Sequence, residues 1–146
     1  MKATLEEWKS ILGSLLKLNH VGLPIQTATW VESDLRKIEP VVEHLKQEHI
    51  ALIEKHGVLQ KDGSSKVPPE NNEAFFAEYN QLIKTEKEIE VRHYKLSVLA
   101  KARLQQGKGE QTESILSPED IRVLKGMLIF DFDKDELNPN LKLIKN

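Results

Sequence analysis

The chain has 146 residues, of which 21 are lysine or arginine and 23 are aspartate or glutamate, so its formal net charge is −2. It has no cysteine, which excludes disulfides, cysteine-ligated zinc and thiol catalysis. A near-neutral charge is atypical of a dedicated nucleic-acid binder, and no apolar run is long enough to span a membrane. We expect one mainly helical domain, residues 1–146, in the cytosol, because residues 1–7 lack signal-peptide features.

The first predicted helix covers residues 5–18 of an N-terminal segment, residues 1–22. Thr4 and Glu7 form a capping-box pattern at its start, and apolar residues follow at steps of three and four. The pattern predicts an amphipathic helix that covers a core. Its Trp8 is interpreted as a core or hinge anchor, with an interface anchor as the alternative.

The second predicted helix begins after Thr27 or Thr29, both suitable N-caps, and ends at His56. Its inward positions repeat every seven residues, the period of a left-handed coiled-coil seam. Pro40 lies inside this pattern and removes a backbone hydrogen bond, so we expect a kink or a break at residues 36–39. The seam residues predicted to form a packing and interaction surface are Val31, Leu35, Ile38, Val42, Leu45, His49 and Leu52.

A small β element and a third helix follow. Asp62 and Gly63 lie between short apolar flanks, which predicts a hairpin turn in a small ribbon or an ordered loop. Pro68 and Pro69 then open a helix that should fold back on the second one as an antiparallel hairpin, residues 27–96 with the β element included. One face of this third helix is predicted to pack on the seam through Phe75, Phe76, Tyr79, Leu82 and Ile83.

The next segment changes periodicity. Residues 88–96 alternate polar and apolar side chains, which predicts a strand paired with the ribbon at residues 58–67 or with a neighbouring subunit. Residues 97–114 lose this pattern, which indicates a linker or insertion.

The final segment, residues 115–146, is predicted to hold a short helix and a polar tail. Ser117 is a favourable N-cap, Pro118 takes the first helical position, and Asp120 can complete the cap.

The histidines do not have metal-site spacing. His49 and His56 share the seam but lie two turns apart, about 10 Å, which is too far to chelate one ion. Glu90 and His93 match half of a di-iron motif, but they fall in the predicted strand. We interpret His49 and His56 as polar seam positions that set the register or face a gap.

Other catalytic and cofactor motifs are also missing from the sequence. Asp131, Asp133 and Asp135 resemble the start of a calcium loop, but Glu136 and Lys142 stand where its glycine and glutamate belong. There is no glycine-rich phosphate loop and no nucleophile elbow. We therefore predict no metal, no cofactor, no catalytic residue and no enzymatic activity.

Charge is segregated along the chain. Residues 91–109 hold five basic residues and no acid (+5), and residues 110–136 hold eight acids and three basic residues (−5). These blocks can fold onto each other or complement each other between subunits, or the basic block can contact phosphates. The predicted contact residues are Arg92, Lys95, Lys101, Arg103 and Lys108 in the basic block and Asp131, Asp133, Asp135 and Glu136 in the acidic block.

Several stretches together resemble a family of small tailed-phage and prophage proteins. They are Leu23-Pro24-Ile25, Ile53–Gly57, Lys61-Asp62-Gly63, Val67–Asn71, Phe75–Glu90 and Leu116–Asp120. The resemblance covers roughly residues 20–125, with residues 99–114 as an insertion, and its motifs are structural. It implies a phage-encoded protein located in the host cytoplasm or incorporated into the virion.

The leading hypothesis is a non-enzymatic interaction protein for virion assembly, in the head–tail or tail region. It would act by self-association or by binding other phage proteins. One alternative is an effector that binds and inhibits a host protein, such as a defence protein. The other is a nucleic-acid-binding accessory protein that uses residues 91–109, the less favoured partner class. No membrane partner is expected.

Overall fold

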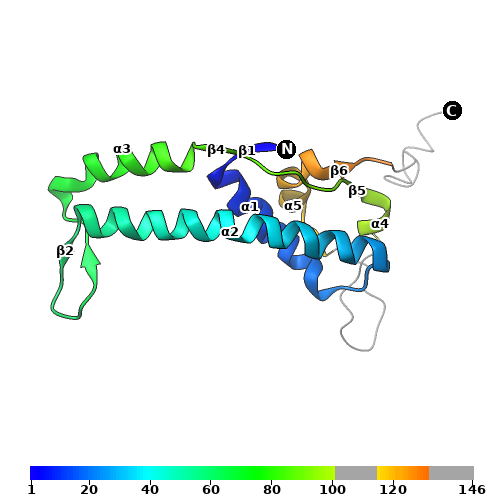
Figure 1. Cartoon of the computed structure of the whole chain (residues 1–146), viewed down its shortest axis with the longest axis horizontal. Helices are drawn as coiled ribbons and strands as arrows, with labels where there is room; N and C mark the ends of the chain where they lie inside the picture. Colours follow the sequence, from blue (N-terminus) through cyan, green and yellow to red (C-terminus); the bar gives the residue numbers. More distant parts are fainter. Residues whose placement is uncertain (101–114, 132–146) are drawn as a thin grey trace. The chain divides into compact units, whose positions relative to one another are not determined.

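A computed structural model of the chain describes residues 1–100 and 115–131 (Figure 1). The described helices are α1 (Leu5–Leu16), α2 (Ile25–His56), α3 (Asn72–Ile83), α4 (Leu96–Ala100) and α5 (Pro118–Val123). The strands are β1 (Lys2–Thr4), β2 (Val58–Leu59), β3 (Ser65–Lys66), β4 (Glu86–Glu88), β5 (Tyr94–Lys95) and β6 (Leu128–Ile129). The predicted mainly α fold, a helical hairpin with flanking helices and small β elements, is confirmed.

The chain forms two compact units, each assembled from separate stretches. The first unit contains residues 1–12 and 35–90, and the second contains residues 13–34 and the described residues from 91 onward. Both α1 and α2 therefore contribute residues to each unit. The single domain expected from the length stays a prediction.

The helical hairpin lies in the first unit (Figure 1). The outer part of α2, residues 35–56, runs antiparallel to α3, with the rings of His49 and Tyr79 4.6 Å apart between centroids. Helix α2 is continuous through Pro40, so the predicted break is wrong and the kink stays a prediction. Pro40 is exposed, which places its ring away from the packed face of the helix.

The hairpin is joined by the predicted ribbon. β2 and β3 pair antiparallel, Val58 opposite Lys66 and Leu59 opposite Ser65. Gly63 has φ of 86°, a conformation that glycine adopts without steric cost. The side chain of Asp62 accepts hydrogen bonds from the backbone N and Oγ of Ser64 at 3.0 and 2.6 Å, as expected for an Asx turn.

The second small sheet of the first unit corrects the strand prediction. β4 pairs antiparallel with β1 through Ala3 opposite Lys87, and not with the ribbon of β2 and β3. Only residues 86–88 and 94–95 of this region are strand, so the predicted strand over residues 88–96 is wrong in its middle. The backbone N of Arg92 donates to the Asp34 carboxylate instead of to a neighbouring strand.

Capping boxes mark the start of two helices, α1 and α5. Thr4 and Glu7 exchange side-chain and backbone hydrogen bonds at 3.1 and 3.2 Å, and Ser117 and Asp120 form the same box, so both predicted boxes are confirmed. The predicted threonine caps of α2 are wrong. That helix begins at Ile25, and the Thr29 hydroxyl donates inside the helix to the Ile25 carbonyl at 2.8 Å.

Each unit has its own apolar core. In the first unit the buried apolar residues are Ala3, Leu5, Trp8, Ile11, Leu35, Ile38, Leu45, Phe75 and Ile89. In the second they are Leu15, Leu18, Val31, Tyr94, Leu96, Leu99, Leu116, Leu124, Met127 and Leu128.

Candidate interaction surfaces

The predicted seam faces inward along the whole of α2. Val31, Leu35, Ile38 and Leu45 are buried, and Val42, His49 and Leu52 are half-buried. On α3, Phe75 is buried and Tyr79, Leu82 and Ile83 are half-buried, whereas Phe76 is 51% exposed and was wrongly placed on the packed face. The seam thus supplies packing within the chain, and its use as a contact surface stays a prediction.

The two seam histidines contact α3. His49 lies against the rings of Phe75 and Tyr79, at centroid distances of 6.1 and 4.6 Å. His56 places Nε2 2.6 Å from the Glu78 carboxylate. The Lys55 ammonium first, and His56 second, lower the pKa of Glu78. Within residues 1–100 and 115–131, no group of three or more histidine, aspartate or glutamate side chains is placed to hold a metal ion.

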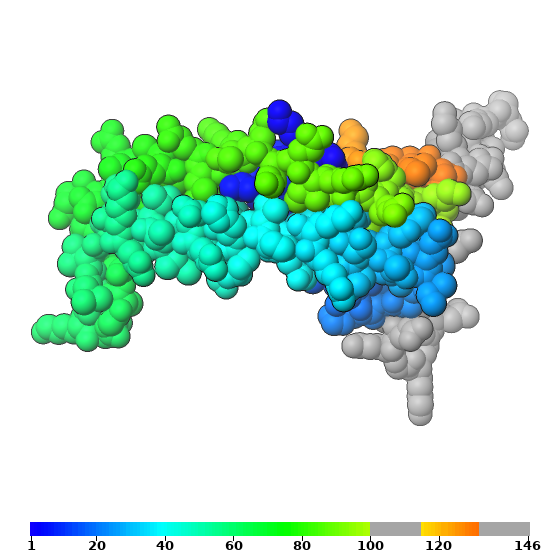
Figure 2. Space-filling view, viewed as in Figure 1, coloured from blue at the N-terminus to red at the C-terminus, as the bar shows by residue number. Residues whose placement is uncertain are grey.

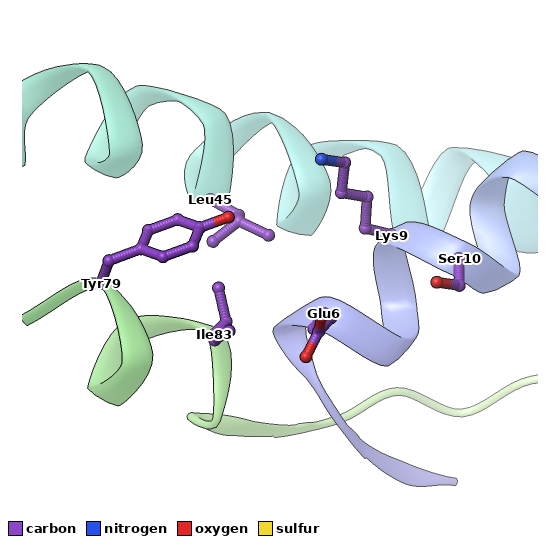
Figure 3. Close-up of a pocket in the computed structure, with 6 residues that line it drawn as sticks. All are labelled: Glu6, Lys9, Ser10, Leu45, Tyr79 and Ile83. Atoms are coloured by element: carbon purple, nitrogen blue, oxygen red, sulfur yellow. The ribbon is translucent and has the colours of Figure 1, made fainter. Parts of the chain in front are cut away.

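A groove lies between α1, α2 and α3 of the first unit (Figure 3). It consists of two hollows of about 300 and 250 Å³ that share Lys9, Leu45 and Tyr79. Figure 3 shows Leu45 of α2 and Ile83 of α3 pointing into the space between the helices, with the Tyr79 hydroxyl turned toward Leu45. The first hollow is also lined by Glu6, Ser10 and Ile83, and the second by Val42, Lys46 and His49.

Half of the polar side chains that line this groove are basic. Within the described part of the chain, the ammonium groups of Lys9 and Lys46 form no ion pair or hydrogen bond. The Tyr79 hydroxyl also lacks a hydrogen-bond partner there, although its ring is stacked at 5.9 Å on Phe75. Among the described lining residues, Glu6 is the only acid, and it belongs to the first hollow alone. Sequence reasoning missed this groove because Lys9 and Lys46 lie on separate helices.

A second surface is the hairpin end, which we define as the exposed large apolar residues of the segment 50–76. They are Ile50 (47% exposed), Val58 (54%), Leu59 (72%) and Phe76 (51%). Figure 2 shows the ribbon of β2 and β3 standing out from the two helices of the hairpin. Isolated exposed apolar side chains are common, but the Leu59 side chain sits on a protruding ribbon that leaves it accessible to a partner.

The charge blocks meet at one described point in the second unit. β5 and β6 pair in parallel, Lys95 opposite Ile129, which brings Lys95 near Asp131. Hydrogen bonds from Ser97 lower the pKa of Asp131, and the charge of Lys95 lowers it further. At this point the blocks fold onto each other within one chain. Lys101, Arg103, Lys108, Asp133, Asp135 and Glu136 lie outside the described residues.

Arg92, the first basic residue of the basic block, makes contacts within the second unit. Its guanidinium lies 5.3 Å from the centre of the Trp30 ring, in the range of a cation–π contact. Its backbone N donates to Asp34 at 3.2 Å. This geometry gives Arg92 a structural role and weakens the case for a phosphate contact there.

Two carboxylates in the second unit are buried and accept hydrogen bonds from neighbouring protein groups. Asp34 is 0% exposed and accepts a 2.5 Å hydrogen bond from the Tyr94 hydroxyl. Burial first, and then this hydrogen bond, raise the pKa of Tyr94. Sequence reasoning missed Asp34, although an acid three residues after Val31 and four before Ile38 on an apolar helix face is a visible signal.

Asp120, the second buried carboxylate, joins α1 to α5. It accepts hydrogen bonds from Ser14 Oγ at 2.9 Å and Lys17 Nζ at 2.6 Å. Burial raises its pKa, but these donors and Ser117 outweigh burial and lower the pKa to about 2. These hydrogen bonds connect α5 to Ser14 of α1 and to Lys17 just after it.

Comparisons with family models, curated proteins and solved structures found no match. No helix in the described ranges 1–100 and 115–131 has the length and hydropathy needed to cross a bilayer. The surfaces of the chain itself therefore carry the case for a function.

Proposed function

We propose that this chain is a non-enzymatic phage protein that acts through protein–protein contacts in virion assembly, in the head–tail or tail region. The observation that carries the proposal is the hairpin end, where Leu59 is 72% exposed on a protruding ribbon. A large apolar side chain at such a place contributes most when a partner covers it. The phage context comes from the family resemblance of the sequence.

The first measurement is the absolute mass in solution, by light scattering after size exclusion at low and high salt. We expect an oligomer larger than the 16.7 kDa chain, or assembly on addition of other virion proteins. Leu59→Asp should abolish this association, because the charge cannot be buried at an apolar interface. Gln60→Asp adds the same charge to an exposed neighbour and serves as the control.

Loss of the oligomer at high salt would implicate the charge blocks, since exposed ion pairs are screened. A monomer at both salts that also fails to join other virion proteins would contradict the assembly proposal. Specific 1:1 binding of that monomer to a host protein would instead support the effector alternative. Salt-sensitive retardation of DNA or RNA in a gel would support the nucleic-acid alternative.

A further inference from the structure

We propose that the groove between α1, α2 and α3 binds an acidic segment of a partner protein, with one apolar side chain in the hollow and carboxylates on Lys9 and Lys46. This inference rests on the proposed function in one respect, that the partner is a protein. It uses a surface different from the hairpin end, so the two can be tested separately.

The size of the groove favours a side chain over a cofactor. Its hollows measure about 300 and 250 Å³, at the lower limit of small-molecule sites. The apolar part of the lining comes from Val42, Leu45 and Ile83. A leucine-sized or phenylalanine-sized side chain inserted there would bury apolar surface that the hairpin leaves open.

The charges of the groove determine the chemistry of the occupant. Lys9, Lys46 and His49 surround the second hollow, where no acid is among the described lining residues. Ammonium groups beside apolar surface form stronger contacts with carboxylates than fully solvated ones do. Glu6 lines only the first hollow and would repel a carboxylate there, so the acids should lie over the second hollow.

Two groups in the groove can also orient a peptide. The Tyr79 hydroxyl and the His49 ring have no hydrogen-bond partner in the described part of the chain, and both line the second hollow. Either can donate to a carboxylate or to a backbone carbonyl. An inorganic anion would pair with the lysines but would leave the apolar floor uncovered, so we favour a peptide that satisfies both.

The test is an NMR titration of the full ¹⁵N-labelled chain with an acetylated heptapeptide of six glutamates around a central leucine. We expect saturable shifts confined to the amides of the groove residues and their neighbours. A Lys9→Glu/Lys46→Glu variant should bind at least about tenfold more weakly. Lys61→Glu, on the exposed turn of the ribbon, makes the same kind of charge change outside the groove and should bind normally.

Two further peptides separate charge from apolar anchoring. A peptide with serine in place of leucine, and one with glutamines in place of glutamates, should each bind at least about tenfold more weakly than the parent. No saturable shift with the parent peptide, equal weakening by Lys61→Glu, or undiminished binding of the serine peptide would overturn the proposal. Inorganic phosphate producing the same shifts as the peptide would also overturn it, because the apolar anchor would then have no role.

The result can be separated from a folding defect and from the proposed function. Lys9 and Lys46 are exposed, so their variants should keep the far-UV circular dichroism and melting temperature of the parent. A Lys9→Gln/Lys46→Gln variant provides a milder second test. If groove binding fails while Leu59-dependent association persists, the groove proposal alone is refuted. If association fails while groove binding persists, the assembly proposal alone is refuted.

Discussion

Replacing Trp8 by phenylalanine probes the packing of the first unit. Trp8 is 0% exposed, and its Nε1 donates to the Lys87 carbonyl at 2.8 Å. Phenylalanine keeps an aromatic ring but removes this donor, which costs about 1–2 kcal/mol when the carbonyl is left without a partner. The smaller ring also leaves a cavity worth about 1–2 kcal/mol. We expect the free energy of unfolding to fall by about 2–4 kcal/mol.

The assay is urea unfolding followed by circular dichroism at 222 nm. The matched control is Trp30→Phe, because Trp30 is half-buried and its ring only flanks the Arg92 guanidinium. An exposed cation–π contact contributes about 0.5–1 kcal/mol, so the control should lose much less stability than Trp8→Phe. Equal losses in the two variants, or a loss below about 0.5 kcal/mol for Trp8→Phe, would refute this account of the core.

Three further changes test separate features. The pKa of Asp120 is lowered from 3.8 to about 2, so its ionised form adds about 2 kcal/mol of stability above pH 4 that is lost as the pH falls toward 2. Asp120→Asn should therefore destabilise the chain in urea at pH 7 and have little effect at pH 2. Tyr94→Phe should lower the free energy of unfolding by about 2–3 kcal/mol, because the buried Asp34 carboxylate loses a hydrogen-bond donor. A double-mutant cycle with Asp34→Asn and Tyr94→Phe should show strong coupling between the two residues. Gly63→Ala should lower the free energy of unfolding by about 1 kcal/mol, because Gly63 has a positive φ. Gly13→Ala should raise it by about 0.5–1 kcal/mol, because Gly13 lies inside α1 with open space around it. Thermal melting of both variants checks the two signs.

Local signals predicted much of the fold. The Thr4 and Ser117 caps, the Asp62 turn and the seven-residue repeat of α2 each involve residues close in sequence. Such patterns depend on nearby backbone geometry, which the sequence encodes directly. The predicted start of α2 was wrong because the Thr29 hydroxyl donates to a carbonyl within the helix. A threonine side chain can cap a helix or bond to the carbonyl four residues earlier, and the sequence does not distinguish the two.

Long-range arrangement could not be predicted in the same way. Strands of two or three residues, such as β1 and β4, are too short for a periodic signal. The alternation over residues 88–96 resembled one strand, but its middle is fixed by the side chain of Asp34. The groove was missed because it depends on how α1 packs against the hairpin, and helical periodicity shows which face is apolar without showing its neighbour.

The pairing of β1 with β4 has a consequence for synthesis on the ribosome. Ala3 is opposite Lys87, so the N-terminal strand has no partner until the chain has grown past residue 88. At about 5–20 residues per second, that interval lasts roughly 4–17 s. During it, Leu5, Trp8 and Ile11 of α1 lack the strand that closes their unit, and they form an apolar stripe that chaperones can bind. A nascent chain halted before residue 86 would keep that stripe uncovered, so the first unit should become resistant to proteases only after β4 has been synthesised.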